Sequence, residues 1–359
     1  MAGGTGGHVF PAIAVAKVLL AREREVVWLG TRRGLEARLV PQAGIPIEWI
    51  KVGGLRGKGP AALLGSPLAL AWALWQAVRV LRRLEPAVVL GMGGFVSGPG
   101  GIAAWLLRRP LIIHEQNTVP GMTNRLLARL AGVVLEAFPG SFHAAARARQ
   151  VGNPVRREIS ALAPPEVRLA GRSGPVRLLV LGGSQGALRL NQVVPESLFR
   201  LPLRLRPEVW HQAGPRTLPA AAEAYRAAEI EARLEAFIDD MAAAYAWADI
   251  VVCRAGALTV SELADAGLGA VFVPFPAAVD DHQTSNARQL VAAGAAVLLP
   301  EAELTAERLA RELGGLLADR GRLLDMARAA RAQAMPDAAE QVAESCLQAA
   351  QPRAERAAA

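Results

Sequence analysis

Glycine-rich segments recur along this chain where a helix is about to begin. Three of them, at 91–101, 182–187 and 254–259, come directly after a short apolar run, and a fourth at 3–8 precedes the helical stretch from Pro11. Glycine lets the backbone approach a ligand closely, and a helix N-terminus offers unpaired amides and a positive dipole end. Four such segments, spread over both halves, predict a two-domain protein that binds a nucleotide or another phosphate compound.

Between these segments, short apolar runs alternate with helical periodicity. The predicted strands are 26–29, 47–52, 87–90, 110–113, 132–137, 176–181, 208–212, 250–253 and 270–274. This alternation is typical of parallel sheets with helices on both faces. A chain of 359 residues is long enough for two domains. The turn-rich, charged segment near 157–175 is the predicted linker.

The charge is distributed unevenly along the chain. Residues 1–160 hold 20 Lys and Arg against 8 Asp and Glu, a net charge of +12, whereas residues 161–359 have a net charge of −4. The basic half is therefore expected to face an anion, which nucleic acid, a phosphate-rich substrate or a membrane surface could provide. The two cysteines, Cys253 and Cys346, lie far apart, which favours a reducing compartment over a disulfide scaffold. Neither the histidine spacing nor any Asp-x-Asp motif predicts a metal site.

The segment 67–83 reads as a helix that is apolar on nearly every side and basic at its end. Its pattern alone favours a packed helix whose basic last turn complements the helix dipole. The alternative is an exposed patch that enters a lipid surface. That patch would comprise Leu68, Trp72 and Trp75 with Arg79, Arg82 and Arg83. Glycines and prolines in the uncharged runs 60–78 and 86–107 argue against a membrane span.

Two polar residues stand out in the first half of the chain. His8 ends the first glycine-rich segment, and Glu115 lies in the run His-Glu-Gln-Asn at 114–117. Both are candidate catalytic groups, and Glu115 directly follows a predicted strand, where the ligands of open α/β sheets lie. Loop capping is the alternative for this run. Further along, Glu262 can be read as a capping acid or as a group that takes ribose hydroxyls.

A rival interpretation is an α/β serine hydrolase. The segment 182–187 fits a nucleophile elbow centred on Ser184, and Asp249 and His282 follow in the order that such enzymes use. A hydrolase, however, would leave the other glycine-rich segments and the basic half unexplained. Ser184 can equally bind phosphate at a helix N-terminus.

Nearly the whole chain resembles the MurG family, the family 28 glycosyltransferases that add N-acetylglucosamine to lipid I in peptidoglycan synthesis. The matching motifs are GGTGGHVFPAIAVA (3–16), GLRGKG (54–59), GMGGFVSGPGG (91–101), HEQN (114–117), VGNPVR (151–156), GGSQGA (182–187), FIDDMAAAYAWAD (237–249), RAGALTVSE (254–262) and HQTSNA (282–287). The resemblance implies a GT-B fold, in which two Rossmann-like, doubly wound parallel-sheet domains face each other across a cleft.

The resemblance also implies a division of the chain. Residues 1–157 would form an acceptor and membrane domain, 158–175 a linker, and 176–335 the UDP-N-acetylglucosamine domain. Residues 336–350 would form a helix returning to the first domain, and 351–359 a frayed tail. The family has a first strand before its first glycine-rich segment, which here begins two residues after Met1. We therefore expect residues of that strand to be missing.

The implied reaction moves N-acetylglucosamine from UDP-N-acetylglucosamine to the 4-hydroxyl of MurNAc in lipid I, undecaprenyl-pyrophosphoryl-MurNAc-pentapeptide. The configuration inverts, lipid II forms, and His8 or Glu115 is the base. By resemblance, the C-terminal domain contacts the donor through Ser184 at the pyrophosphate, Ile238 at the uracil, Ala257, Leu258, Thr259, Val260 and Ser261 along phosphate and ribose, Glu262 at the ribose hydroxyls, and Gln283 at the sugar. The N-terminal domain contributes Thr5, Gly6, Gly7, Asn117 and Arg156.

The resemblance implies neither a cofactor nor a tightly bound metal. The expected partners are UDP-N-acetylglucosamine, lipid I, the anionic surface of the inner membrane and other cell-wall synthesis proteins, but not nucleic acid. The expected location is peripheral, on the cytoplasmic face of the inner membrane. With this family in view, the membrane-patch interpretation of 67–83 becomes the favoured one.

Overall fold

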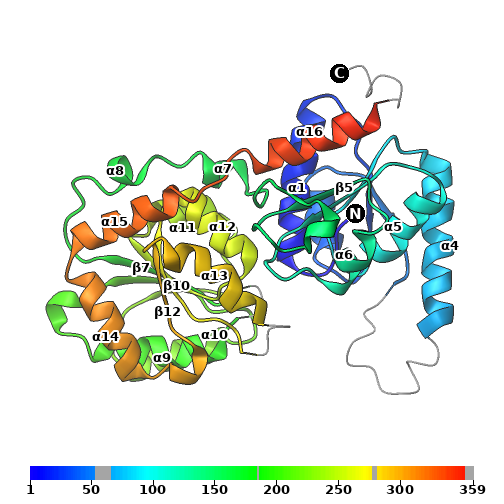
Figure 1. Ribbon diagram of the computed structural model, residues 1–359. Helices are drawn as coiled ribbons and strands as arrows, with labels where there is room; N and C mark the ends of the chain where they lie inside the picture. Colours follow the sequence, from blue (N-terminus) through cyan, green and yellow to red (C-terminus); the bar gives the residue numbers. More distant parts are fainter. Residues whose placement is uncertain (53–65, 184–185, 277–280, 352–359) are drawn as a thin grey trace. The chain divides into compact units, whose positions relative to one another are not determined.

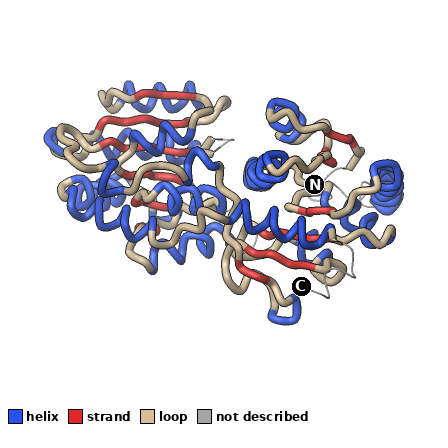
Figure 2. Tube along the Cα trace, turned by 90° about the horizontal axis from the view of Figure 1, so that it is seen from above, coloured by secondary structure: helices blue, strands red, loops and turns tan. Residues whose placement is uncertain are grey.

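The computed structural model describes residues 1–52, 66–183, 186–276 and 281–351 (Figure 1). The chain divides into two compact units. Unit 1 contains Met1–Arg156 together with Pro336–Ala359, and unit 2 contains Arg157–Met335. Strands lie side by side in each unit, with helices packed around them (Figure 2). No helix in the described ranges is long and apolar enough to cross a membrane.

Unit 2 contains a parallel six-stranded sheet in the order β12-β11-β10-β7-β8-β9. Its strands are β7 (Arg177–Leu181), β8 (Glu208–Gln212), β9 (Arg233–Glu235), β10 (Ile250–Cys253), β11 (Gly269–Phe272) and β12 (Ala296–Leu298). The chain adds strands on one side of β7 and then returns to add β10 on the other side. Ligands of doubly wound sheets bind at such a switch point, at the carboxyl ends of the strands. The switch point of unit 2 therefore lies between the segments that follow β7 and β10.

Two layers of helices cover the sheet of unit 2 (Figure 1). One layer contains α9 (Leu188–Phe199), α10 (Leu218–Ala227) and α14 (Ala306–Leu317), and the other contains α11 (Met241–Trp247), α12 (Ala257–Ala266), α13 (His282–Ala292) and α15 (Arg320–Arg331). Short 3-10 turns occur at η2 (Leu203–Leu205) and η4 (Glu301–Glu303). The central strands β7, β10 and β11 are nearly continuous apolar runs, as expected for a parallel sheet buried on both faces.

The predicted linker at 158–175 is instead part of unit 2. It forms the short helices α7 (Arg157–Ser160) and α8 (Pro165–Arg168). Arg168 donates to the carbonyl of Ala266 at 2.8 Å, and Arg172 donates to that of Trp247 at 2.8 Å. These carbonyls lie at the ends of α12 and α11, where no intrahelical donor is available. The turn-rich composition indicated a linker, but two arginines fix this segment to two helix ends.

Unit 1 contains two parallel sheets, β1-β2 and β3-β4-β5-β6. The strands are β1 (Trp28–Gly30), β2 (Ile47–Trp49), β3 (Val89–Gly91), β4 (Leu111–Glu115), β5 (Val133–Glu136) and β6 (Arg149–Gln150). The helices are α1 (Gly6–Ala21), α2 (Glu36–Gln42), α4 (Ser66–Leu84), α5 (Ser97–Leu106), α6 (Met122–Leu127) and α16 (Ala338–Ala350), with a 3-10 turn at η1 (Ala144–Ala146).

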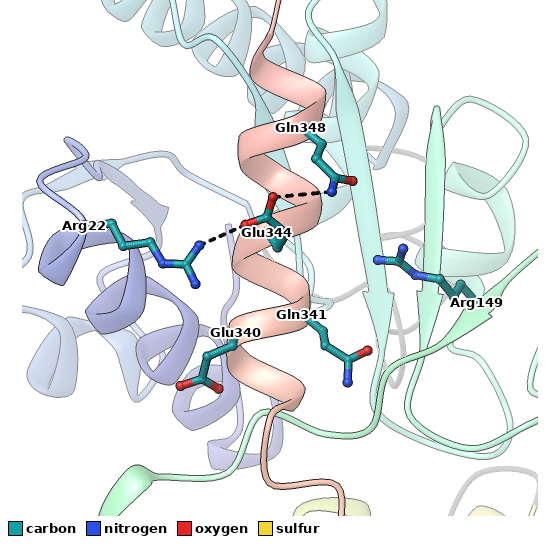
Figure 3. A pocket seen from close by; sticks show the side chains of 6 residues that line it. All are labelled: Arg22, Arg149, Glu340, Gln341, Glu344 and Gln348. Carbon is teal, nitrogen blue, oxygen red and sulfur yellow. Dashed lines mark hydrogen bonds and ion pairs between the residues drawn. The ribbon is translucent and has the colours of Figure 1, made fainter. Parts of the chain in front are cut away.

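Helix α16 packs against α1 (Figure 1). Its apolar face, including Val342 and Cys346, joins the core formed by Val9 and Ile13 of α1. A pocket beside α16 is lined by the side chains of Arg22, Arg149, Glu340, Gln341, Glu344 and Gln348 (Figure 3). Arg22 pairs with Glu344 at 2.9 Å, and Arg149 donates to Ser345. Both apolar packing and polar contacts therefore hold the C-terminal helix on unit 1.

The first residues pair with β3. The amine of Met1 donates to the carbonyl of Leu90 at 2.8 Å, and the amide of Met92 donates to the carbonyl of Met1 at 2.9 Å. The indole of Trp28 in β1 donates to the carbonyl of Ala2 at 3.0 Å. Residues 1 and 2 thus connect the two sheets of unit 1. The expectation that strand residues are missing concerns residues outside this sequence and stays a prediction.

Candidate active site

His8 is the end of a chain of hydrogen-bonded side chains in unit 1. Its Nδ1 lies 2.8 Å from Oε1 of Gln116, and Nε2 of Gln116 lies 3.1 Å from Nδ1 of His114. Nε2 of His114 lies 2.9 Å from the carbonyl oxygen of Gly152. His114 and Gln116 are buried, and burial lowers the pKa of His114 to about 4. His8 is therefore positioned by a neutral, buried network at the end of β4.

The second glycine-rich segment packs against the first and against His8. A Cβ atom at Gly93 would lie 2.7 Å from Nδ1 of His8, and one at Gly94 would collide with the backbone of Gly3. Gly93 and Gly94 also have φ angles of +90° and +81°, which favour glycine. The glycines at these two positions thus permit close packing around His8.

Glu115 organises its own loop. Its Oε1 accepts hydrogen bonds from the backbone amide of Asn117 at 3.0 Å and from the side-chain amide of Asn117 at 3.1 Å. Its Oε2 accepts from Gly121 at 3.1 Å and from Asn124 at 2.9 Å. The residue is 1% exposed. A general base needs a lone pair within reach of the substrate, so this geometry favours His8 over Glu115 as the base and supports the capping interpretation of Glu115.

The remaining unit 1 positions implied by the resemblance lie at the start of α1, after β4, and at Arg156, the last residue of the first segment of unit 1. Thr5 is the N-cap of α1, and Gly6 and Gly7 are its first residues. The amides in the first turn of a helix have no intrahelical acceptor, so this end suits an anion. The Arg156 guanidinium lies 4.9 Å from the ring of Phe10, on α1. Asn117 follows β4 and holds Glu115.

In unit 2, the positions implied for the donor gather at the carboxyl edge of the sheet. Ala257, Leu258, Thr259, Val260, Ser261 and Glu262 form the first half of α12, directly after β10. Ile238 follows β9 and is held at its amide by Oε1 of Gln212 at 3.3 Å. Gln283 is the second residue of α13 and accepts from the amide of Phe275 at 2.9 Å. Ser184 lies outside the described residues, as does the 54–59 motif. The described part of this set thus follows β9, β10 and β11.

The glycines that flank Ser184 are tightly packed. A Cβ atom at Gly182 would lie 2.8 Å from the amide nitrogen of Ala187, and one at Gly186 would lie 2.6 Å from the carbonyl oxygen of Ala213. Gly186 also has a φ angle of +79°. The segment after β7 therefore runs close to the segment after β8, on the side of the switch point opposite α12.

Two residues that the sequence did not single out support this edge of unit 2. The phenol of Tyr245 on α11 donates to Oε2 of Glu262 at 2.9 Å. Arg254 donates to the carbonyl of Val273 at 3.1 Å and pairs with Glu301. An aromatic residue in an alanine-rich helix gives no functional signal. The motif beginning at Arg254 was visible, but the partners of its guanidinium were not.

The serine hydrolase interpretation is wrong. Asp249 lies at the amino end of β10, where its carboxylate pairs with Arg172 and accepts from the amide of Arg177 at 2.9 Å. Arg177 is the first residue of β7, whereas Ser184 comes after the last. The five-residue strand spans roughly 16 Å. A catalytic triad needs direct hydrogen bonds, which this separation between Asp249 and the segment after β7 does not allow.

Metal ligation and thiol chemistry gain no support from the described residues. Among them, no group of three or more His, Cys, Asp or Glu is placed to hold a metal ion. Cys253 and Cys346 are both buried, and burial raises the pKa of each thiol well above its usual range. A protonated, buried thiol is neither a nucleophile nor a metal ligand.

Helix α4 exposes its aromatic side chains. Leu68 is 79% exposed, Trp72 52% and Trp75 48%, whereas Ala73, Ala77 and Leu81 are buried on the opposite face. The two indole rings stack at 4.7 Å, and the Arg79 guanidinium lies 5.6 Å from the ring of Trp75. Arg83 pairs with Glu48 at 2.7 Å. The interpretation of this segment as a fully packed helix is therefore wrong for Leu68, Trp72 and Trp75.

Comparisons with known proteins agree with this architecture. The Glycosyltransferase family 28 N-terminal domain matches residues 1–135, and the Glycosyltransferase family 28 C-terminal domain matches residues 177–342. Among solved structures, Acinetobacter baumannii MurG has a TM-score of 0.82 and 41% identity, over 97% of this chain and 98% of that one. The calicheamicin glycosyltransferase CalG4 has a TM-score of 0.66 at 18% identity, over 96% of each chain. These likenesses confirm the predicted GT-B fold class.

Curated relatives match over almost their entire length. One from Nitrosococcus oceani is 63% identical and one from Alkalilimnicola ehrlichii is 60% identical, each over 97% of both chains. Both are named UDP-N-acetylglucosamine–N-acetylmuramyl-(pentapeptide) pyrophosphoryl-undecaprenol N-acetylglucosamine transferase. The chain belongs to glycosyltransferase family 28, and within it to the MurG N-acetylglucosaminyltransferases.

Proposed function

We propose that this protein transfers N-acetylglucosamine from UDP-N-acetylglucosamine to lipid I and thereby forms lipid II. The observation that carries this proposal is the 63% identity, over 97% of both chains, to a relative named for this transfer. The geometry around His8 and α12 is compatible with it. The attacking hydroxyl needs a base, and the departing diphosphate needs an anion-binding group such as a helix N-terminus.

The donor would bind at the switch point of unit 2. The first-turn amides of α12 and the segment after β7 would meet the diphosphate, with Ser184 as a hydroxyl donor. Glu262 would accept hydrogen bonds from the ribose hydroxyls, Ile238 would contact the uracil, and Gln283 the sugar. From unit 1, the start of α1 with Thr5, Gly6 and Gly7 would add further contacts, as would Asn117 and Arg156.

The chemical step would be a single inverting displacement. The 4-hydroxyl oxygen of MurNAc attacks the anomeric carbon, the bond from that carbon to the phosphate oxygen breaks, and UDP leaves with the electron pair. The hydroxyl proton passes to His8 and from there to solvent. Helix N-termini and Arg156 would stabilise the charge that develops on the diphosphate, without a cofactor or a tightly held metal.

The acceptor is linked to a lipid, so the protein must reach a membrane surface. The exposed residues Leu68, Trp72 and Trp75 on α4 provide apolar area, and Arg79, Arg82 and Arg83 on the same helix provide positive charge. Together they suit peripheral binding to anionic lipid on the cytoplasmic face of the inner membrane, rather than to nucleic acid. Other cell-wall synthesis proteins are the expected protein partners at that surface.

Transfer of labelled N-acetylglucosamine to a lipid I analogue tests the proposal directly. The wild-type protein should form labelled lipid II and should be stabilised against heat by UDP. His8→Ala should keep the stabilisation by UDP and lose transfer by about 10²- to 10⁴-fold, the usual contribution of a general base. A folded wild-type protein that UDP does not stabilise and that transfers no label would overturn the proposed function.

A further inference from the structure

We infer that Gln116 and His114 are positioning residues that hold His8 in one tautomer, with its proton on Nδ1 and its lone pair on Nε2. The inference deepens the proposed function, because it rests on the role of His8 as the base. It also says which nitrogen of His8 accepts the proton from the acceptor hydroxyl.

The proton on His114 has only one possible place. Its Nε2 lies 2.9 Å from the carbonyl oxygen of Gly152, and a carbonyl can only accept. Nε2 of His114 therefore carries the hydrogen. The ring is fully buried and neutral at physiological pH, since burial lowers its pKa to about 4. Its Nδ1 consequently has a lone pair and must accept.

The orientation of the Gln116 amide follows from this. Its nitrogen lies 3.1 Å from Nδ1 of His114 and 3.3 Å from the backbone carbonyl oxygen of the same residue. Both atoms are acceptors, so the NH₂ group must face His114. The opposite orientation would place the amide oxygen against two acceptors. Oε1 of Gln116 therefore faces His8.

The tautomer of His8 is then determined. Oε1 of Gln116 has no hydrogen, and Nδ1 of His8 lies 2.8 Å from it. Nδ1 must donate, which leaves the lone pair of the neutral imidazole on Nε2. In catalytic triads a carboxylate does this for a histidine, and the wrong tautomer there costs about 10⁴-fold in rate. In this network a neutral amide takes that place.

Two asparagine side chains also hold the backbone of Gln116 and His114 in position. The side chain of Asn153 donates to the carbonyl of Gln116 at 3.1 Å, and that of Asn124 donates to the carbonyl of His114 at 3.1 Å. Gln116 is 1% exposed, so water does not compete for its amide. The NH₂ group of the Gln116 amide is held by His114 and its oxygen by His8, so the side chain loses little further conformational freedom when it orients His8.

Nitrogen NMR of histidine-labelled protein tests the inference without any activity measurement. The chain has five histidines, and His8→Gln identifies the signals of His8 by their loss. At a pH where its ring is neutral, wild-type His8 should show a protonated Nδ1 and an unprotonated Nε2, and His114 the reverse. In Gln116→Leu, His8 should lose its preference for the Nδ1 proton. A wild-type His8 protonated on Nε2, or one that Gln116→Leu does not change, would overturn the inference.

A double-mutant cycle separates positioning from a merely structural role. Gln116→Leu should lower kcat for transfer by roughly 10²-fold or more and leave the affinity for UDP unchanged. In a His8→Ala background, the same substitution should cost nothing further. Losses that add in the double variant would contradict the inference. Because the NMR result requires no turnover, a failure of the proposed function remains distinguishable from a failure of the tautomer assignment.

Discussion

The phenol of Tyr245 donates a 2.9 Å hydrogen bond to Oε2 of Glu262 and so joins α11 to α12. Tyr245 is fully buried and Glu262 is 5% exposed, so the bond forms where water competes little. Glu262 is the carboxylate that we propose for the ribose hydroxyls of the donor. Tyr245 would then act on donor binding through Glu262, because it determines how that carboxylate is oriented.

Removing this phenol should weaken donor binding selectively. Tyr245→Phe removes the hydrogen bond that orients the Glu262 carboxylate before the donor binds, so the Kd for UDP should rise. The Kd for 2′-deoxy-UDP should change less, since that ligand lacks a hydroxyl for Glu262 to bind. Calorimetric titration of both ligands measures the difference.

The chain offers a matched control, because its second tyrosine is also buried in unit 2. Tyr225 hydrogen-bonds Nδ1 of His211 at 2.9 Å, and Tyr225→Phe should leave the affinity for UDP unchanged. An equal loss for UDP and 2′-deoxy-UDP in Tyr245→Phe would mean that Glu262 does not bind the ribose.

Glu115 and His8 should respond differently to substitution. Glu115→Gln turns an NH₂ group toward donors at Asn117, Gly121 or Asn124, which should lower the free energy of unfolding by about 1–3 kcal/mol. His8→Ala should remove most transfer while UDP still stabilises the protein. Melting curves and initial rates of both variants test this. A Glu115→Gln protein of normal stability that has lost all transfer would restore Glu115 as the base.

Gly93 should tolerate no side chain, because its Cβ would lie 2.7 Å from the imidazole of His8. Gly93→Ala should therefore displace His8 and reduce kcat by at least tenfold, up to the factor of about 10²–10⁴ that a general base contributes. Gly44→Ala is the matched control. Gly44 also has a positive φ, of +72°, but no atom lies near the added methyl group. Transfer rates of the two variants, each normalised to the amount of folded protein, separate the effect of the clash from that of backbone strain. Equal losses of transfer in Gly93→Ala and Gly44→Ala would contradict this prediction.

The sequence predicted every central strand and also the edge strands β1, β2 and β3. Apolar runs predicted β8 and β10 at their observed bounds, Glu208–Gln212 and Ile250–Cys253. Three strands were missed: β6, β9 and β12, each at the edge of its sheet. Edge strands are short and partly exposed. β6 and β9 read Arg-Gln and Arg-Leu-Glu and so lack the apolar run on which the prediction depends, whereas β12 reads Ala-Val-Leu and is only three residues long.

The site was predicted by its motifs rather than by its contacts. Glycine-rich segments and the polar run at 114–117 indicated where ligands bind, because helix termini and strand ends share one edge of a sheet. The choice between His8 and Glu115 was not visible, since it depends on which donors reach the Glu115 carboxylate. The partners of Tyr245 and Gln116 likewise come from elements that only the folded chain brings together.

His211 should make unit 2 sensitive to acid. Burial lowers the pKa of His211 to about 3, whereas an unfolded histidine titrates near 6.5. As the pH falls from 6.5 toward 3, the unfolded state binds the proton first, so the free energy of unfolding decreases, by roughly 5 kcal/mol in full. Denaturant unfolding at several pH values should show a shallower slope in His211→Phe than in wild type. His143→Gln, at an exposed position, should keep the wild-type slope, and an unchanged slope in His211→Phe would contradict the assignment.

The exposed face of α4 should bind anionic vesicles through apolar contact and charge together. Leu68→Ser should weaken binding to phosphatidylglycerol vesicles by roughly tenfold, because an inserted leucine contributes about 1–2 kcal/mol. Leu203 is as exposed as Leu68, at 79%, but lies in unit 2, so Leu203→Ser is the matched control and should have no effect. Replacing Arg79 and Arg82 with Gln should weaken binding at low salt and reduce its salt dependence, since each charge near the surface contributes about 1 kcal/mol. Sedimentation with vesicles measures all four proteins, and equal losses in Leu68→Ser and Leu203→Ser would exclude α4 as the membrane-binding face.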